Sequence, residues 1–475
     1  MNQHYIEGMT CEVSRRRFLQ GAGCGALGFV GSSELTGAAS PSAQNFAAHL
    51  KISKQLPPRL TIALWIWGYL TACGPGEPYE DLDRAFAQTL ERGFNTIRAE
   101  MALNWCFDQQ GRPRGPVEIA GWAPGVNQNL RGLNNRGGIR YNVLDRVLKM
   151  FELAKKHDVF VIATSWEYQD SSSFLADAGL RQDVFSTPLA ERFERLANMH
   201  DRLIQELRKH GLEKQIAFVE IHNELNASDF PKGYNAQKPL VEKALRRLQT
   251  SHPDILFTAD YANVGPCFEK GFSGYDTLPD NLQVADHHIY TGGVEDALTE
   301  QLGMSNWNEV PPDPKTNPLL RRLIGERPRV SWEEWTRRAE RIPKFWWPIQ
   351  WLFANLTDPD RYDYWMFEHF GDYAAMMKAL IQAGMREWGE FARSRGLPAI
   401  VDEGYISWPP NNSRFEESAA VRQILEVVVD TAIEQNYWGM MITTYCAPDE
   451  PIWTENPEWV KKSNQRFLKS PRPLT

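Results

Sequence analysis

This chain of 475 residues has few cysteines, a small net charge and little repetitive glycine or proline. The six cysteines include no C-x-x-C pair, so their spacing indicates neither a zinc ribbon nor a thioredoxin-like redox site. Lys and Arg number 52 against 60 Asp and Glu, a net charge of −8, which lacks the basic excess that nucleic-acid binding requires. With 34 Gly and 30 Pro, the composition is also far from that of a fibrous repeat.

Apolar and aromatic side chains are plentiful instead. Hydrophobic residues make up 42% of the chain and include 17 Trp, which excludes a disordered protein and predicts a packed globule. At roughly 150 residues per domain the length allows about three domains, but a single α/β barrel with insertions can be equally long.

The N-terminus carries the pattern of an export signal. Three consecutive arginines, Arg15 to Arg17, precede an uncharged stretch of 16 residues, Phe18–Ser33, that is rich in glycine. This pattern resembles a twin-arginine signal, and Gly37-Ala38-Ala39 offers small residues for a signal peptidase. The alternatives are a short anchor or a basic tail, but the uncharged stretch is shorter than the ~20 residues that span a bilayer.

This pattern predicts the organisation of the chain. We expect residues 1–39 to be the signal, residues 40–58 a linker and residues 59–475 one folded domain. The precursor would engage the twin-arginine export machinery, and the mature protein would be periplasmic or secreted, without a stable membrane span. An oxidising compartment permits a disulfide, for which Cys73 and Cys106 are the favoured pair, although buried thiols are the equal alternative. The oligomeric state is left open.

From Leu60 onward, apolar runs of strand length alternate with longer amphipathic segments. The expected strands are Leu60–Trp67, Asn95–Ala99, Val159–Ser165, Ile216–Ile221, Ile255–Ala259, Gln283–His288, Ala399–Asp402 and Met440–Thr444. The expected helices include Tyr79–Arg92, Val143–His157, Leu189–His210, Pro239–Ser251, Ala374–Ser394 and Ala419–Gln435. Strands that are apolar on both faces belong in a parallel sheet covered by helices. The alternation therefore predicts the α/β class and a (β/α)₈ barrel.

Two connections are unusually long. Met101 to Asn142, after the second strand, is rich in glycine and is expected to be an irregular loop over the barrel mouth. An insertion after the sixth strand, about 291–370, contains many tryptophans, most of which we expect to form a small hydrophobic core.

The chemistry of such a barrel lies at the carboxyl ends of its strands, and these ends are polar here. Glu224 ends the fourth expected strand and Glu403 ends the seventh. Across the mouth, two such carboxylates can be about 5 to 5.5 Å apart, the separation that a retaining glycoside hydrolase uses. One would donate a proton to the leaving oxygen, and the other would attack the anomeric carbon.

These residues resemble those of the large clan of (β/α)₈ retaining glycoside hydrolases that includes the cellulases, in which Asn-Glu closes strand four and a second Glu closes strand seven. The resemblance implies that Glu224 is the acid and base, that Asn223 holds the sugar 2-hydroxyl and that Glu403 is the nucleophile. Arg98 matches the arginine that pairs with the nucleophile and keeps it ionised. Within this clan the chain resembles cellulase-like proteins of unassigned specificity, some known only to bind sugar.

Further positions complete the expected substrate site. His288-Ile289-Tyr290 resembles the His-x-Tyr that closes strand six, whose tyrosine also bonds the nucleophile. Where many cellulase-like proteins close strand three with histidine, this chain has Trp166-Glu167, and strand eight offers Tyr445 where tryptophan is usual. Trp67, Trp166 and Tyr445 are expected to stack on a sugar ring, with Glu167 as a further substrate ligand.

The sequence thus predicts an exported retaining glycoside hydrolase that needs no cofactor and no metal. One alternative is a catalytically silent carbohydrate-binding protein on the same barrel. Another is a metal-dependent hydrolase using Asp260, Asp286, His287 and His288, for which the first strand lacks the usual His-x-His. The sugar, the linkage and endo or exo action are not predicted.

Overall fold

The computed structural model describes residues 56–121, 135–262, 275, 278–304, 313–324, 330–338, 341, 347–405, 410, 412–444 and 446–471. Its main sheet has eight parallel strands in the order β7-β6-β5-β2-β1-β10-β9-β8. Their bounds are β1 (Leu60–Ile66), β2 (Thr96–Glu100), β5 (Phe160–Thr164), β6 (Ile216–Glu220), β7 (Phe257–Thr258), β8 (Ala285–Tyr290), β9 (Ala399–Tyr405) and β10 (Gly439–Met441).

The two outer strands of this order, β7 and β8, meet and close the sheet. Ala262 bridges His288 in parallel. The hydroxyl of Thr258 donates to the carbonyl of Val284 at 2.6 Å, just before β8. Because every strand then has two neighbours, the sheet is a barrel, and the predicted (β/α)₈ fold is confirmed. All eight predicted strands are present.

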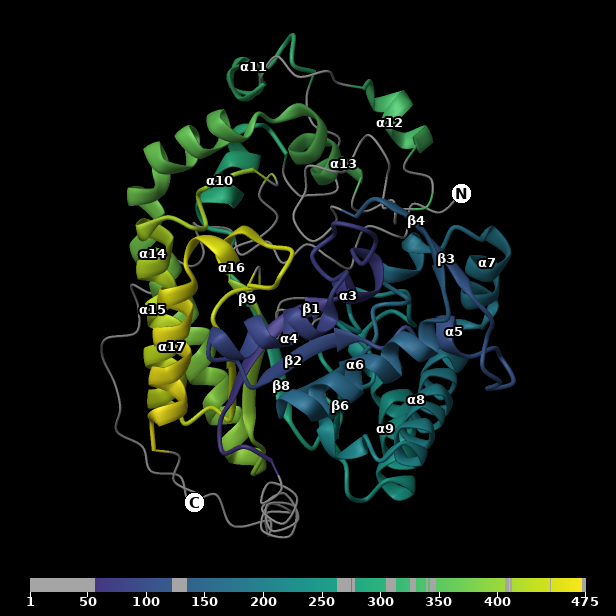
Figure 1. Ribbon diagram of the computed structural model, residues 1–475. Helices are drawn as coiled ribbons and strands as arrows, with labels where there is room; N and C mark the ends of the chain where they lie inside the picture. Colours follow the sequence, from purple (N-terminus) through teal and green to yellow (C-terminus); the bar gives the residue numbers. More distant parts are fainter. Residues whose placement is uncertain are drawn as a thin grey trace.

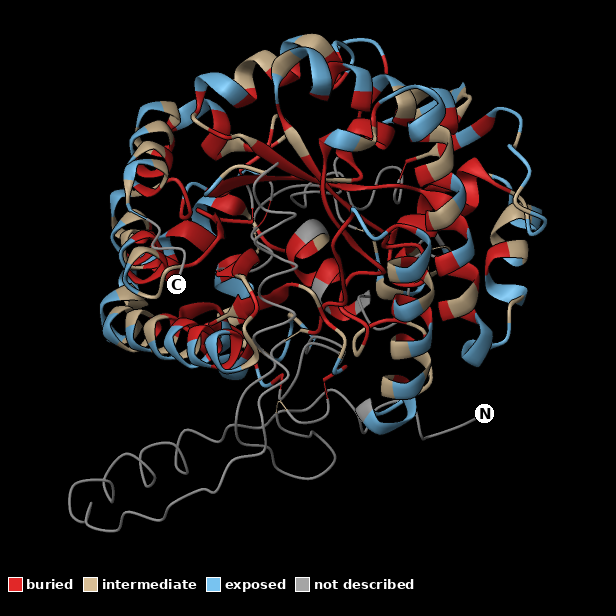
Figure 2. Ribbon diagram, turned by 90° about the horizontal axis from the view of Figure 1, so that it is seen from below, coloured by how far each residue is buried: buried red, intermediate tan, exposed pale blue. Residues whose placement is uncertain are grey.

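Amphipathic helices cover the outside of the barrel (Figure 1). The long ones are α4 (Leu82–Glu91), α6 (Val143–His157), α8 (Arg192–Lys209), α9 (Tyr234–Ser251), α14 (Pro359–Arg395), α15 (Ala419–Glu434) and α17 (Pro457–Lys469). Several begin at capping side chains that the sequence supplies, namely Asp81, Asn142, Asp358 and Ser418. Figure 2 shows the buried sides of these helices turned toward the barrel and their exposed sides turned outward.

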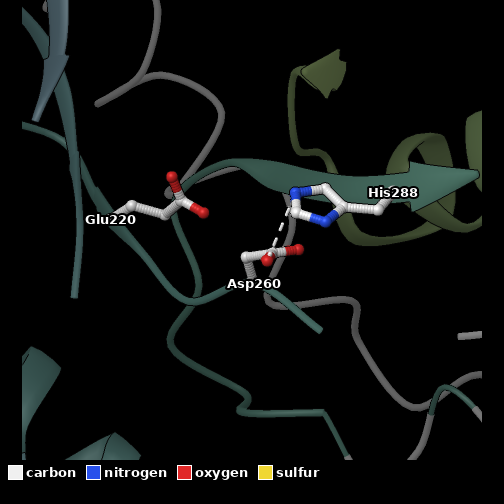
Figure 3. A group of neighbouring side chains, drawn as sticks. All are labelled: Glu220, Asp260 and His288. Atoms are coloured by element: carbon white, nitrogen blue, oxygen red, sulfur yellow. Dashed lines mark ion pairs between the residues drawn. The ribbon is translucent and has the colours of Figure 1, made fainter. Parts of the chain in front are cut away.

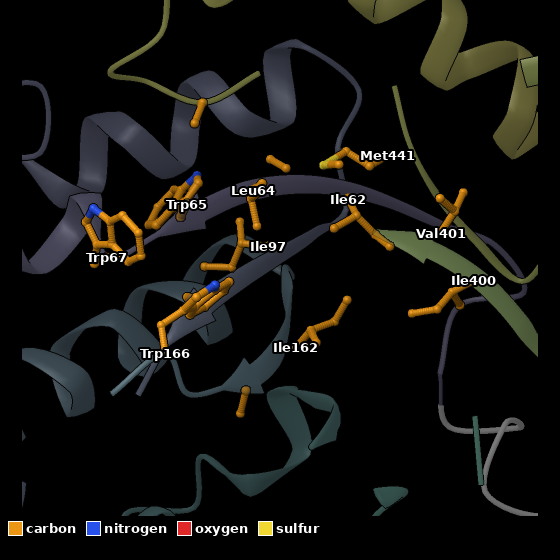
Figure 4. Packing of buried hydrophobic residues seen from close by; sticks show 14 of the residues in the cluster. Ile62, Leu64, Trp65, Trp67, Ile97, Ile162, Trp166, Ile400, Val401 and Met441 are labelled. Carbon is orange, nitrogen blue, oxygen red and sulfur yellow. The ribbon is translucent and has the colours of Figure 1, made fainter. Parts of the chain in front are cut away.

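Aliphatic side chains from neighbouring strands pack together in the core (Figure 4). Ile62 and Leu64 of β1, Ile97 of β2, Ile162 of β5 and Ile400 of β9 are each at most 1% exposed. This packing explains why the strands read as continuous apolar runs, since apolar contacts are needed on both their faces.

The sequence predicts that the glycine-rich connection is irregular, but part of it is regular. It contains an antiparallel pair, β3 (Val117–Ala120) and β4 (Gly137–Tyr141). Gly137 has φ +70° and lies so close to the backbone of Gly121 that a Cβ atom would come within 2.0 Å of its nitrogen. Glycine is therefore required where the pairing register shifts.

The insertion after β8 is helical where it is described. It contains α10 (Val294–Gln301), α11 (Pro318–Leu323), α12 (Trp332–Arg338), α13 (Trp347–Gln350) and the π-helix η7 (Trp351–Leu356), and α14 begins within its expected bounds. The ring of Trp335, at 0% exposure, stacks on Trp332 with centroids 6.0 Å apart. The edge of Trp351 meets Trp332 at 5.3 Å. These three tryptophans form the small core that the composition predicts, whereas Trp307 and Trp346 lie outside the described residues.

Shorter helices occupy the remaining loops. They are α3 (Gly68–Thr71), η2 (Ser171–Phe174), α5 (Leu103–Cys106), α7 (Ala178–Ser186), η3 (Leu189–Glu191), η4 (Glu213–Gln215) and α16 (Pro451–Glu455). No helix in the described part of the chain is long and apolar enough to cross a membrane. Cys73 and Cys106, the favoured disulfide pair, are free thiols. The predicted signal, and all but the last three residues of the predicted linker, lie outside the described residues.

Candidate active site

The carboxyl ends of β2, β6, β8 and β9 bring six of the predicted site residues into one hydrogen-bonded cluster. They are Arg98, Asn223, Glu224, His288, Tyr290 and Glu403. Only the two glutamates among the ion-paired members reach solvent, with side-chain exposures of 11% for Glu224 and 13% for Glu403, while Arg98 and His288 are at 0%. The cluster therefore presents two carboxylates to a ligand and buries Arg98 and His288, which bind them.

Glu403 is bound through both of its carboxylate oxygens. Nη1 of Arg98 donates to Oε2 at 2.8 Å, and the hydroxyl of Tyr290 donates to Oε1. Both partners project from strands next to or across from β9, so the barrel itself fixes the carboxylate. The arrangement is the one that the sequence predicts for Arg98 and Tyr290.

Glu224 follows β6 in a left-handed backbone conformation with φ +41°. Such a conformation is strained for a residue with a Cβ, and it is held by the carboxylate of Asp260, which accepts the backbone N–H of Glu224 at 2.8 Å. The side chain is held as well. Its Oε1 lies 2.9 Å from Nδ1 of His288, and its Oε2 accepts from Nε2 of Gln169 at 2.9 Å.

His288 is surrounded by carboxylates. Its Nε2 lies 3.3 Å from Asp260, 3.4 Å from Asp402 and 3.7 Å from Glu403. Figure 3 shows Asp260 and His288 turned toward each other, with Glu220 nearby. Burial alone would lower the pKa of His288, but the charges of Asp260 and Glu403 outweigh it and hold that pKa well above its usual value.

The protonated imidazole in turn affects Glu224. Burial raises the pKa of Glu224, but the hydrogen bond and charge of His288 outweigh burial, so that the pKa lies below its ordinary value. The proton between these two residues is therefore held on His288.

The distance between the two exposed carboxylates is short. One oxygen of Glu224, one oxygen of Glu403 and a ring nitrogen of His288 all lie within 4.8 Å of one another.

Arg98 connects the cluster across the barrel, and most of its partners were not foreseen from sequence. Its Nε and Nη2 bind both oxygens of Glu220, at 2.9 and 2.7 Å. Nε also lies 3.0 Å from Asp402. The guanidinium carbon stands 4.7 Å from the centroid of the Trp166 ring. A bidentate pair with further ionic contacts gives the guanidinium a single orientation.

Asn223 lies inside this network and is only 1% exposed. Its Oδ1 accepts from Nη2 of Arg98 at 2.6 Å, and its Nδ2 donates to Oε1 of Gln169 at 2.7 Å. Both ends of the amide are thus bonded to protein, where the resemblance assigns it to a sugar hydroxyl. Gln169, which sequence reasoning missed, links Asn223 to Glu224.

The aromatic residues at the strand ends are buried. Trp67 is 4% and Trp166 2% exposed, and their rings meet edge to face with centroids 6.0 Å apart. They support Arg98 and the loops instead of forming an open stacking platform. Tyr445 lies outside the described residues.

Glu167, predicted as a substrate ligand, is 0% exposed. Its Oε1 accepts the backbone N–H of Asn104 and its Oε2 the hydroxyl of Ser165, at 2.5 and 3.1 Å. Burial raises the pKa of Glu167 to about 7, and burial together with the charge of Glu167 raises the pKa of Glu100 to about 8. Both side chains are fully buried, so neither presents its carboxylate to a ligand.

Four further carboxylates lie buried around this cluster. Glu220, Asp260 and Asp402 are each 0% exposed, and Asp286 is 3% exposed. Two of them stand at even spacing before recognised site residues, Glu220 before Glu224 and Asp286 before His288. Even spacing in a strand is the signal that could have found Asp286, since residues i and i+2 share a face.

The residues of the metal-dependent alternative are not brought together as a set. His287 lies on the outer face of β8, where its ring stacks on Trp388 of α14 at 4.6 Å and its Nε2 lies 3.1 Å from the hydroxyl of Tyr437. Asp260, His288 and Glu220 do place one ligand atom each within 4.8 Å of one another. Both oxygens of Glu220 already bind Arg98, so this carboxylate is paired with a positive charge of the protein itself.

Comparison with known proteins adds a likeness in fold. No model of a known protein family matches the chain, and no curated protein matches it. A solved structure from Parabacteroides distasonis, described provisionally as a glycoside hydrolase, is 18% identical with a TM-score of 0.60, covering 87% of this chain and 94% of its own. This likeness spans nearly the whole barrel.

Two other solved structures are more distant. The endo-β-1,4-mannanase of Thermotoga petrophila is 11% identical with a TM-score of 0.44, covering 86% of this chain and 77% of its own. A glycoside hydrolase family 5 mannosidase of Rhizomucor miehei is 10% identical with a TM-score of 0.44, covering 88% and 96%.

Proposed function

We propose that the protein is a retaining glycoside hydrolase with Glu403 as nucleophile and Glu224 as acid and base. The observation that carries this proposal is the spacing of at most 4.8 Å between an oxygen of Glu224 and an oxygen of Glu403. Retaining enzymes hold the two carboxyl groups about 5–5.5 Å apart, whereas inverting enzymes need roughly 6.5–9.5 Å to admit a water between them.

The reaction then proceeds in two displacements. In the first, an oxygen of Glu403 forms a bond to the anomeric carbon while the bond from that carbon to the leaving oxygen breaks. Glu224 gives its proton to the leaving oxygen, and the aglycone departs as an alcohol. In the second, a water molecule gives a proton to Glu224 and attacks the same carbon, and Glu403 leaves as a carboxylate.

The surroundings of each glutamate suit its role. Arg98 and Tyr290 bind one oxygen each of Glu403, which orients the carboxylate for attack. Glu224 needs a proton, and His288 holds one at 2.9 Å from Oε1. When a leaving oxygen develops negative charge, this proton can move along the hydrogen bond to Glu224. Glu224 is then protonated and can act as the acid.

The substrate in this proposal is an oligo- or polysaccharide with an O-glycosidic bond. Since Trp67 and Trp166 are buried, a sugar ring must find its stacking partner elsewhere on the mouth, and Tyr445 remains the expected candidate.

The test is hydrolysis of aryl glycosides, including β-glucoside, β-galactoside, β-mannoside and α-arabinofuranoside, by wild type, Glu224→Gln and Glu403→Gln. Activity on one sugar that falls by orders of magnitude in both variants supports the proposal. Glu458→Gln, an exposed carboxylate on α17, is the matched control and should retain activity. If no substrate is cleaved although calorimetry detects sugar binding, the protein is a carbohydrate-binding barrel instead.

A 2-fluoro sugar with an activated leaving group tests the covalent step directly. Its electronegative fluorine slows the second displacement, so a retaining enzyme accumulates as the glycosyl ester. Intact-mass measurement should then find one sugar per chain in wild type and none in Glu403→Gln. An inverting enzyme would acquire no label.

We further propose that the precursor is exported by the twin-arginine pathway and acts in the periplasm or outside the cell. The support is the sequence of the first 39 residues, with Arg15 and Arg16 before an uncharged stretch. Replacing both with Lys should leave uncleaved protein in the cytoplasm, as fractionation and N-terminal sequencing would detect. Export of this double variant at the wild-type level would exclude the pathway.

A further inference from the structure

We propose that Asp286 is a neutral carboxylic acid that donates its proton to Asp402, and so positions Asp402 against Arg98 and His288 beneath the two reacting glutamates. Asp286 touches neither the expected sugar nor the reacting atoms, and its role is positioning. Its effect on activity rests on the proposed function, whereas its protonation can be measured without any substrate.

The first argument is the place of Asp286 on β8. It stands two residues before His288 and four before Tyr290, so the three side chains share one face of the strand. The intervening His287 packs outward on Trp388. Asp286 therefore points into the barrel, one layer below the site.

The second argument is the irregular pairing of β8 with β9. His287 pairs with Val401 and His288 pairs with Glu403, so Asp402 is passed over in the register. An extra residue in one strand turns its side chain out of the regular alternation. This irregularity allows the consecutive residues Asp402 and Glu403 both to meet Arg98, at 3.0 and 2.8 Å.

The third argument is the lack of donors around Asp286. Neither of its carboxylate oxygens meets a hydrogen-bond donor among the described residues. One oxygen each of Asp286, Asp402 and Glu220 lie within 4.8 Å of one another. Two carboxyl groups can share a hydrogen bond only when one of them carries a proton.

The charges on every side determine which residue carries that proton. Glu220 of β6, Asp260 after β7 and Asp402 of β9 face Asp286 with negative charge, and Arg98 of β2 faces it with positive charge. Arg98 is nearest to Asp402 and Glu220, and its charge outweighs burial to lower the pKa of Asp402. For Asp286, burial and the charge of Asp402 raise the pKa well above its usual value. Asp402 is thus the acceptor.

This proton has a structural consequence for the site. Without it, Asp286 and Asp402 would repel each other, and Asp402 would move away from Nε2 of His288, 3.4 Å distant. His288 is the group that holds Glu224 through its other nitrogen. Protonated Asp286 therefore helps to fix the imidazole of His288, on which Glu224 depends as acid and base.

Infrared spectroscopy of the full folded chain at neutral pH tests the protonation state. The carbonyl stretch of a protonated carboxyl group absorbs at a higher wavenumber than the stretches of a carboxylate. This band shifts to a lower wavenumber in deuterated water. Glu100, whose pKa is about 8, contributes such a band as well. Each variant is therefore compared with wild type, and we expect one band to be lost in Asp286→Asn and none in the control Glu458→Gln, an exposed carboxylate on α17. A wild-type spectrum without the band, or a band unaffected by Asp286→Asn, overturns the proposal.

Activity separates positioning from simple packing. Asp286→Asn keeps a donor toward Asp402 and should retain at least a tenth of the wild-type kcat, whereas Asp286→Leu should lose a hundredfold or more with KM changed less than threefold. Equal losses in both variants, when circular dichroism confirms that both fold, would overturn the positioning role. Should Asp286→Leu fail to fold, the infrared comparison still decides the protonation.

Elemental analysis of the purified protein addresses a different occupant. A tightly bound divalent cation, present at one per chain and lost from Asp286→Asn, would mean that a metal bridges these carboxylates and would overturn the proposal. If wild type proves inactive on every sugar while the infrared band behaves as expected, the proposed function fails and this inference stands.

Discussion

Nδ1 of His288 lies 2.9 Å from Oε1 of Glu224, while Nε2 of the same ring faces the carboxylates of Asp260, Asp402 and Glu403 at 3.3 to 3.7 Å. One imidazole thus connects the buried acidic interior of the barrel to one of its two solvent-accessible glutamates. The relationship makes the protonation of Glu224 a property of the whole cluster.

Replacing His288 with Asn should lower kcat by about a hundredfold, the usual scale of general acid catalysis. The loss should be largest for glycosides with poor leaving groups, because a good leaving group such as nitrophenolate needs little protonation. Kinetics with a series of aryl glycosides of graded leaving-group pKa measures this. An equal loss across the series would mean that His288 does not act through the acid.

Tyr290→Phe removes the hydroxyl that donates to Oε1 of Glu403 and leaves the ring in place. We expect kcat to fall roughly 10- to 100-fold, with a loss of stability of only about 1 kcal/mol. Steady-state kinetics and urea unfolding measure the two effects. Tyr364→Phe on α14, where the tyrosine is 71% exposed, is the matched control and should change neither.

Arg98→Met should destabilise the protein and inactivate it together. The guanidinium is fully buried and ion-paired with Glu220, Asp402 and Glu403, so its removal leaves negative charges unpaired in the interior. Breaking a buried ion pair in this way costs about 3–5 kcal/mol. A stability loss under 1 kcal/mol in denaturant unfolding would contradict the assigned network.

Stability should fall as the pH rises through 7 and 8. Folding raises the pKa of Glu167 to about 7 and that of Glu100 to about 8, mainly through burial, so the folded chain binds protons that the unfolded chain has already lost. The stabilising effect of the retained protons is complete below the unfolded pKa values near 4 and is lost as the folded pKa values are passed.

Between pH 6 and 9 we expect a loss on the order of 2–4 kcal/mol from this pair. Unfolding in urea across that pH range measures it, and Glu100→Gln should flatten the curve because the amide cannot ionise. A free energy of unfolding that does not fall across this range in wild type would show that the two carboxyl groups are already ionised in the folded state.

The sequence predicts the barrel well because its strands must be apolar on both faces. Leu60–Ile66 and Phe160–Thr164 are continuous apolar runs for that reason, and turn residues separate them from the helices. The strand ends also place Glu224 and Glu403 at one mouth. The resemblance to retaining glycoside hydrolases adds Arg98 and Tyr290 as neighbours of Glu403.

The deeper part of the cluster is harder to predict. Asp286 and Glu220 look like ordinary polar positions within short strands, and their pairing depends on which strands are adjacent and in what register. Asp402 reaches Arg98 only through the irregular pairing of β9. Trp67 and Trp166 illustrate a further limit, because their place at strand ends does not determine whether the rings face solvent or core.

The position of Arg98 also has a consequence for how such a protein can change over time. The guanidinium of Arg98 binds carboxylates on both β6 and β9. A substitution at Glu220 therefore also changes how Arg98 holds Asp402 and Glu403. Effects of mutations at these positions will not add, since each residue depends on the same partner. Homologous chains should therefore either keep the four residues together or replace them in concert, and covariation among them would be the trace of that dependence.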